Sequence, residues 1–215
     1  MPKVLPEYLE TRRQQILDAA AACFARGGFH RTTMQDICSE AELSPGAVYR
    51  YFQSKEDIIQ AMCSRGHEED VETIREAMSL NDTVAIIDQL IHVFFTAIED
   101  RELCALTVEL VSEGKHNQPI SESVREGWYA IFDALSELVS QGQARGEINP
   151  ALDVAAVTRV MLGVYQGLLL QKLLEPDIDV TGYVETTRAL FQGNFWQASR
   201  DATATGRAAE GALRH

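Results

Sequence analysis

Helical spacing of apolar residues constrains this chain more than any other feature. Apolar side chains recur every three or four residues through almost the whole sequence, and most of these runs begin at a residue suited to cap a helix. Thr33 and Ser54 are each followed three residues later by Asp, which is the pattern of a capping box. Gly146 and Pro176 stand where such runs end. The sequence therefore predicts an all-α protein.

The predicted helices follow these runs. They span about Tyr8–Arg26, Met34–Ala41, Ser44–Phe52, Ser54–Met78, Asp82–Glu99, Leu103–Val111, Ile120–Ala144, Leu152–Leu174 and Val180–Trp196. In the third, Val48 and Phe52 are four residues apart and are expected to point inward. The helix opened by Asn149-Pro150 is apolar around most of its circumference, so we expect it to be buried.

Two of the short predicted helices form a recognisable unit. Met34–Ala41 and the helix that starts at Ser44 are separated by about three residues, and the second opens with a cap followed by proline. This arrangement is typical of a helix-turn-helix, whose second helix lies in the major groove of DNA. Similar three-helix units also bind proteins, so that alternative stays open.

The residues of this unit resemble the signature of the TetR-like family of bacterial transcription repressors. Thr32–Ile37, Ala41–Phe52 and Ser54–Asp57 carry the resemblance, which covers about residues 10–60. It implies an N-terminal helix-turn-helix domain at 1–53 and a helical effector-binding and dimerisation domain at 54–198. It also implies a cytoplasmic repressor that leaves a palindromic operator when a small molecule binds. The tail, residues 199–215, is small and polar and is expected to be disordered.

Several DNA contacts follow from the resemblance. Thr33 and Lys55 lie at helix N-termini, where phosphates bind well, and Tyr49 and Tyr51 match aromatic phosphate contacts of the family. The remaining candidates lie on the face that reaches base edges: Ser44, Pro45, Gly46, Ala47 and Arg50.

Each contact has an alternative. Arg50 is expected either to bind guanine bidentately, worth about 1–3 kcal/mol of discrimination, or to hold a phosphate. Thr33 and Ser44 would also be present as plain helix caps, and Tyr51 would also fit as a packing partner of Phe52.

The charge is unevenly distributed. The net charge is −13, yet residues 1–53 hold six basic and six acidic side chains, and the remainder holds 13 basic and 26 acidic ones. Repulsion between an acidic body and DNA is screened over about 10 Å at 0.1 M salt. A neutral head can therefore approach DNA first.

A dimer is expected because one module contacts too few base pairs for tight specific binding. Half-sites would lie about 34–36 Å apart, or at multiples of that distance. The last two apolar helices resemble the pair that forms a four-helix dimer bundle in the family. The candidate interface residues, which would also suit an ordinary intramolecular core, are Gly163, Gly167, Leu170, Phe191 and Phe195.

The resemblance further implies that an effector enters the body and shifts the helix that begins at Lys55. Large side chains on inward stripes are candidates for its pocket, although each would also suit core packing: Met62, Phe94, Trp128, Phe132, Met161, Tyr165 and Leu169. Glu109 is expected either on an exposed side or as a counter-charge for a cationic ligand. A DNA-binding dimer that has no effector and acts through protein partners is the alternative function.

Other classes of function find little support. The sequence has no phosphate-binding loop, no nucleophile elbow and no zincin motif, so we expect neither an enzyme nor a cofactor. We expect no metal site, because His67, His92 and His116 fit solvated positions, and no membrane segment. The four cysteines are expected as buried thiols.

Overall fold

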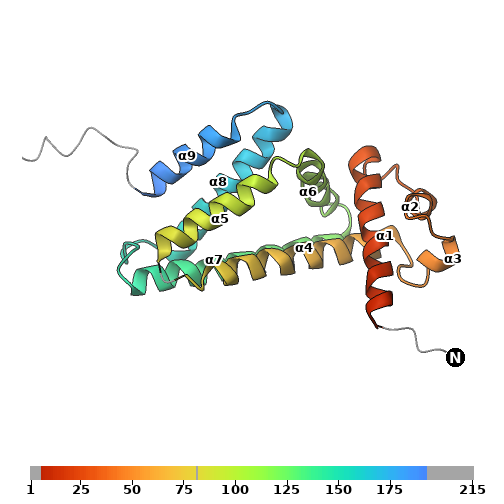
Figure 1. The fold of residues 1–215 in the computed structure, drawn as a ribbon, viewed down its shortest axis with the longest axis horizontal. Helices are drawn as coiled ribbons and strands as arrows, with labels where there is room; N and C mark the ends of the chain where they lie inside the picture. The colour runs from red at the N-terminus through yellow and green to blue at the C-terminus, as the bar shows by residue number, and fades with distance from the viewer. Residues whose placement is uncertain (1–5, 81, 193–215) are drawn as a thin grey trace, which may run out of the picture. The chain divides into compact units, whose positions relative to one another are not determined.

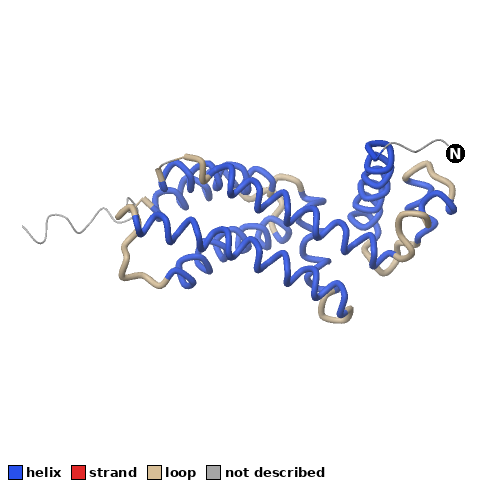
Figure 2. The backbone as a smooth tube through the Cα atoms, turned by 90° about the horizontal axis from the view of Figure 1, so that it is seen from below, coloured by secondary structure: helices blue, strands red, loops and turns tan. Residues whose placement is uncertain are grey.

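The computed structural model describes residues 6–80 and 82–192, and these ranges contain helices and turns but no strand (Figures 1 and 2). The all-α prediction is confirmed. The helices are α1 Pro6–Gly27, α2 Met34–Glu40, α3 Pro45–Val48, α4 Lys55–Ala77, α5 Thr83–Ala97, α6 Arg101–Glu113, α7 Gln118–Ala144, α8 Val154–Leu174 and α9 Val180–Phe191. Contacts divide the chain into two units, Met1–Ile178 and Asp179–His215, and α9 lies in the second.

The caps predicted from the sequence set the starts of the N-terminal helices. Thr33 and Ser54 both form complete capping boxes, and the Ser44 side chain accepts the backbone N–H of Ala47. Helix α3 is several residues shorter than expected. It ends at Val48, and turn hydrogen bonds carry the chain on to Phe52.

The start of α8 differs from the prediction. Asp153 caps this helix by accepting the backbone N–H of Ala156 at 2.8 Å, whereas Asn149 forms a separate turn with Ala151 and Leu152. The side chain of Asp153 sits directly before the apolar run, so it satisfies the free N–H groups that Asn149 is too distant to reach.

Two hydrophobic clusters fill the first unit. The cluster that we call the head core joins α1–α4 with parts of α6 and α7, and includes Phe24, Ile37, Val48, Phe52 and Ile58. The cluster that we call the body core joins α4, α5, α7 and α8 around Ile74, Ile86, Leu138 and Leu162. All four cysteines are free and buried, as expected.

The helices α4 and α7 run side by side in the first unit (Figures 1 and 2). At Gly127 of α7 the ring of His67 of α4 occupies the place that a Cβ would take. Burial lowers the pKa of His67. The expectation that this histidine is solvated is therefore wrong, because the glycine lets its ring enter the interface.

The apolar helix α8 exposes one of its sides. Val160, Leu170 and Leu174 are 60%, 52% and 75% exposed, and a Cβ added at Gly163 would meet nothing within 4 Å. The prediction that this helix is buried holds only for its other side, which carries Leu162, Leu168 and Leu169. By length and composition α8 could also cross a membrane, a property that it shares with core helices of water-soluble proteins.

Candidate nucleic-acid interface

Two buried side chains hold α3 and the turn after it on the head core, and the opposite face is exposed. Val48 is fully buried and Phe52 is 4% exposed, so both hold this segment on the head core. Tyr49 is 43% exposed, Arg50 is exposed, and a Cβ at Gly46 would meet nothing within 4 Å. The face that would read base edges is therefore free of cover by the described part of the chain.

The turn between α2 and α3 is fixed by its backbone conformation and by contacts with α1. Glu42 adopts a left-handed backbone conformation with φ of 53°, which reverses the chain between α2 and α3. The Gln15 amide of α1 donates to the Ala41 carbonyl at 2.7 Å, and Arg26 forms an ion pair with Glu40 at 2.6 Å. These two contacts hold the end of α2 on α1, directly before the turn that leads to α3.

The candidate phosphate contacts differ in how free they are. Thr33 is exposed, and its hydroxyl donates to Asp36 at 2.7 Å within the capping box. Lys55 donates to the Phe29 carbonyl at 2.7 Å and lies 4.3 Å from the centre of the Phe29 ring. Tyr51 is half-buried against the head core. The single hydroxyl hydrogen of Thr33 is already donated to Asp36, so Thr33 has to exchange this partner before it donates to a phosphate, whereas the Lys55 ammonium keeps further N–H donors.

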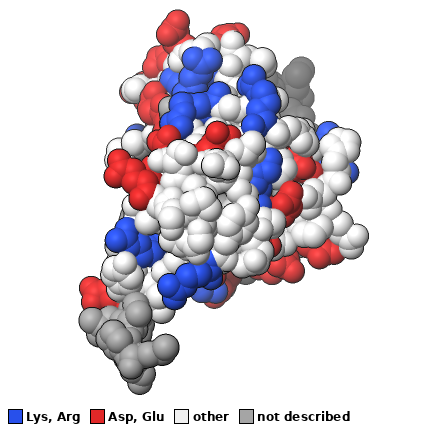
Figure 3. Space-filling view, turned by 90° about the vertical axis from the view of Figure 1, so that its right-hand side faces the viewer, with Lys and Arg blue, Asp and Glu red and all other residues white. Residues whose placement is uncertain are grey.

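The charges on this side of the molecule have both signs. Figure 3 faces the end that carries α2 and α3, and shows Lys and Arg in separate patches around a largely uncharged centre, with Asp and Glu among them. This agrees with the balanced composition of residues 1–53.

Helix α6 holds the turn between α1 and α2, a contact that the sequence did not predict. The backbone N–H of Phe29 donates to the Glu109 carboxylate, and His30 pairs with Glu113 at 3.0 Å. Glu109 is therefore half-buried and bound to the backbone, and the expectation that it lies on an exposed side is wrong. The two carboxylates connect the body to the loop that precedes Thr33.

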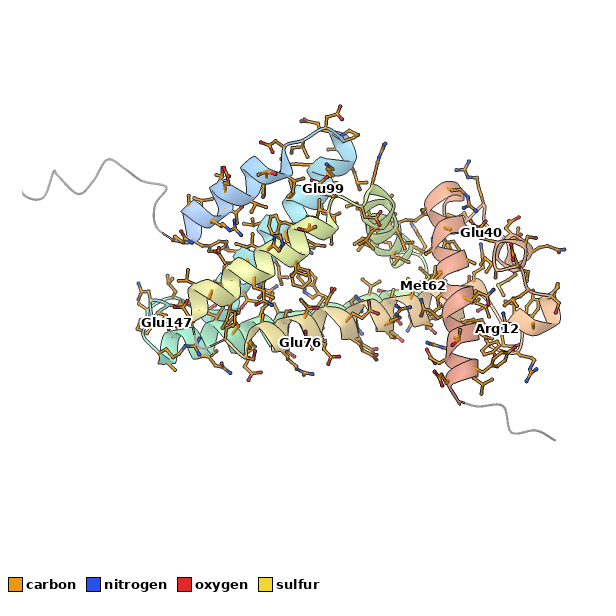
Figure 4. All side chains as sticks on the ribbon, viewed as in Figure 1. Arg12, Glu40, Met62, Glu76, Glu99 and Glu147 are labelled. Carbon is orange, nitrogen blue, oxygen red and sulfur yellow. The ribbon has the colours of Figure 1, made fainter. Side chains whose placement is uncertain are left out.

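The candidate pocket residues fall into two groups. Met62 packs against the head core and lies toward the opposite end of α4 from Glu76 (Figure 4). Phe94, Trp128, Phe132 and Met161 pack against the body core. Tyr165 meets the rings of Phe94 and Phe95 edge-on, each at 5.9 Å between centroids, and Leu169 is buried.

Asp70 is a second residue that the sequence did not single out. Burial raises the pKa of this carboxyl to about 6, with a smaller contribution from Glu69. It stands in the acidic run Glu68-Glu69-Asp70, which had suggested a solvated surface. The signal that could have found it is helical spacing. Asp70 lies seven residues after Cys63 and four before Ile74, so it is on the same side of α4 as these two buried residues.

The candidate dimer residues are partly exposed. Gly163 and Leu170 lie on the exposed side of α8, Gly167 is half-buried, and Phe191 of α9 is 39% exposed. Phe195 and the predicted tail, residues 199–215, lie outside the described residues. Within residues 6–80 and 82–192, no three His, Cys, Asp or Glu side chains gather in a way that could hold a metal ion.

Two family models match the chain. Residues 16–62 match the model of bacterial regulatory proteins of the tetR family, and residues 85–209 match that of the BetI-type transcriptional repressor C-terminal domain. The HTH-type transcriptional regulator UidR of Escherichia coli K12 is 28% identical over 182 residues, covering 84% of this chain and 91% of that protein.

Solved structures agree with these matches. Salmonella enterica GusR has a TM-score of 0.71 at 30% identity, with 86% of this chain and 95% of GusR covered. FadR of Bacillus subtilis, solved in complex with stearoyl-CoA, has a TM-score of 0.76 at 22% identity, with 84% and 98% covered, and it supports the fold alone. The helix-turn-helix geometry, the family models and the relatives lead to one conclusion: the chain belongs to the tetR family of bacterial regulatory proteins.

Proposed function

We propose that this regulator is a cytoplasmic repressor that binds a palindromic operator as a homodimer and releases it when a small molecule binds the body. The observation that carries the proposal is the uncovered face of α3, with Gly46, Tyr49 and Arg50 presented above the buried Val48 and Phe52. A short helix of this kind reads base edges only if small residues let its backbone come close to the groove.

The proposed division of labour follows the domains expected from the sequence. Residues 1–53 bind DNA: Thr33, Tyr49, Tyr51 and Lys55 hold phosphates, while Arg50 and the neighbouring positions 44–47 meet base edges. Residues 54–198 bind the effector and the second copy of the chain. The exposed side of α8 supports the dimer, because an uncovered apolar strip on a long helix is stabilised by a partner.

The route from effector to DNA is proposed to run through α6 and α4. Glu109 and Glu113 hold the loop that precedes Thr33, and Lys55 at the start of α4 holds the same loop at Phe29. An effector that favours another position of either helix shifts this loop, provided that it binds the two arrangements with different affinity.

Selection of duplexes from a random library tests the proposal, with the full-length chain as the bait. We expect a palindromic site and a strong dependence on salt. If Arg50 reads a base, Arg50→Ala loses about 1–3 kcal/mol of discrimination at one position of each half-site only. If it holds a phosphate, binding weakens for all sequences and the salt slope falls by about one.

Arg125→Ala is the matched control, since Arg125 is an exposed arginine of α7. Its site and affinity should equal those of the wild type. A library from which nothing is retained would refute the proposed function.

A further inference from the structure

Two arginines continue the core-facing side of α1 toward its N-terminal end. Arg13 lies three residues before Ile16 and seven before Ala20, and both of these are fully buried, so Arg13 points the same way. Arg12, four residues before Ile16, lies at the edge of this side, and Figure 4 shows it toward α3. Both arginines precede residue 16, where the match to the first family model begins.

Arg13 packs on the residue that holds the segment after α3. Its guanidinium lies over the ring of Phe52, 5.6 Å from the ring centre, and Phe52 belongs to the head core. Arg13 therefore lies between α1 and the segment proposed to read bases. Its side chain is nevertheless 37% exposed. Stacking holds the side chain against the protein while part of it stays open to solvent.

Within the described part of the chain, neither arginine is neutralised by a close ion pair. Arg13 is 3.6 Å from Glu10, whose side chain is 68% exposed. Exposed pairs of this kind contribute little and are screened by salt. Arg12 donates to neutral groups, the Tyr8 hydroxyl at 3.1 Å and the Gln15 side-chain oxygen at 2.6 Å. Both positive charges therefore remain available to an anion.

The acidic residues of α1 lie mainly on another side of the helix. Glu7 and Asp18 line an open groove with Glu42 of the turn before α3, and Glu10 borders the same groove. Positions 13 and 18 are separated by about 140° around a helix. A duplex is therefore repelled by the groove and attracted to the side that carries Arg13.

We infer that Arg13, assisted by Arg12, holds a backbone phosphate of the operator beside the groove that α3 enters. The inference rests on the proposed function, because it takes α3 as the helix in the major groove. A helix with its side chains is about 10–12 Å wide and the major groove about 12 Å, so an element directly beside α3 meets the phosphates at the groove edge. A guanidinium bound to a phosphate adds affinity and register without reading a base.

Fluorescence anisotropy of the full-length protein on its selected operator, at several salt concentrations, tests this contact. Arg13→Gln keeps part of the stem over Phe52 and removes the charge. We expect it to bind specific and non-specific duplexes at least about tenfold more weakly, with a salt slope lower by about one for each bound chain. Arg13→Lys keeps the charge and should keep the slope.

Glu10→Gln should act in the opposite direction, because it removes a charge that competes with the phosphate for Arg13. We expect binding to tighten by about twofold to threefold. Arg65→Gln is the matched control, since Arg65 is 43% exposed and also pairs with a glutamate of its own helix, Glu69, at 2.7 Å. It should bind like the wild type.

Neutral methylphosphonates, introduced at one phosphate at a time, locate the partner of Arg13. At one position of each half-site, the substitution should weaken the wild type about tenfold and leave Arg13→Gln unchanged, as a double-mutant cycle measures. The inference is overturned if no position shows this coupling, if Arg13→Gln keeps the wild-type affinity and salt slope, or if Arg65→Gln loses as much.

Should Arg13→Gln lose its helix content, Glu10→Gln decides, because unchanged or weaker binding by that variant overturns the inference. Specific binding by the wild type that Arg13→Gln leaves unaltered would refute this contact alone. A wild-type chain that retains no duplex would refute the proposed function, and the phosphate contact with it.

Discussion

Asp70 shows at the scale of one residue how a partly buried carboxylate lowers stability. Its pKa of about 6 lies above the ordinary value of 3.8, so the folded chain binds this proton more tightly than the unfolded chain does. The ionised carboxylate therefore costs stability at pH values above 6, and this cost falls as the pH drops from 6 toward 4.

Asp70→Asn should accordingly be more stable than the wild type at pH 7.5, by an amount of the order of 2 kcal/mol. The gain should be about half as large at pH 5, where most of the wild-type side chain is already protonated in the folded state. Urea unfolding at the two pH values measures the difference. Equal stability at pH 7.5 would mean that the carboxylate is better solvated than its position indicates.

Glu109 stabilises the fold, because its carboxylate accepts the backbone N–H of Phe29. Glu109→Leu leaves the Phe29 N–H without its partner and should cost about 1–3 kcal/mol, whereas Glu109→Gln keeps an acceptor oxygen and should cost less. Hydrogen exchange at the Phe29 amide gives the local readout. We expect loss of protection in the Leu variant, and protection that survives there would contradict the contact.

Among the elements, the pair α4 and α7 is the most sensitive to a single added methyl group. A Cβ at position 127 would overlap the His67 ring, so Gly127→Ala should destabilise the fold by at least about 1–3 kcal/mol through overpacking. His67→Ala in the same chain should restore much of this loss, which a double-mutant cycle measures.

Gly66→Ala is the matched control on α4, because nothing lies within 4 Å of the added Cβ. It should stabilise the helix by about 0.5–1 kcal/mol. If both glycine variants lost equal stability, the loss at position 127 could not be assigned to the close approach of His67.

The sequence predicted most elements well because their signals are local. The capping boxes at Thr33 and Ser54 lie within four residues, and the Val48–Phe52 spacing alone showed which side of the third helix is buried. Glu109 and Phe29 are 80 residues apart, and no periodicity reports such a contact. Asp70 was missed because it follows Glu68 and Glu69, and the three together were interpreted as a solvated acidic run. Its spacing from the apolar residues of the same helix was not considered.

The whole molecule is acidic, but its exposed apolar strip on α8 is uncharged. Val160, Gly163, Leu170 and Leu174 repeat at helical spacing, as expected for a surface that another helix covers. Such a strip brings two acidic bodies together only if the apolar area that they bury outweighs their mutual repulsion.

Replacing both Leu170 and Leu174 with Glu should convert the proposed dimer into a monomer, because charges at the centre of an apolar interface are costly. Sedimentation at micromolar concentration measures the mass. Val84→Glu is the control, since Val84 is 51% exposed and lies on α5 instead of α8. A wild-type chain that sediments as a monomer would contradict the dimer.

The meeting of His67 with Gly127 also bears on how such regulators diverge. The His67 ring fills the space that a side chain at position 127 would need, so a substitution at one of these positions changes what the other can accept. Among descendants of this chain, a larger residue at 127 should appear only where 67 has become small.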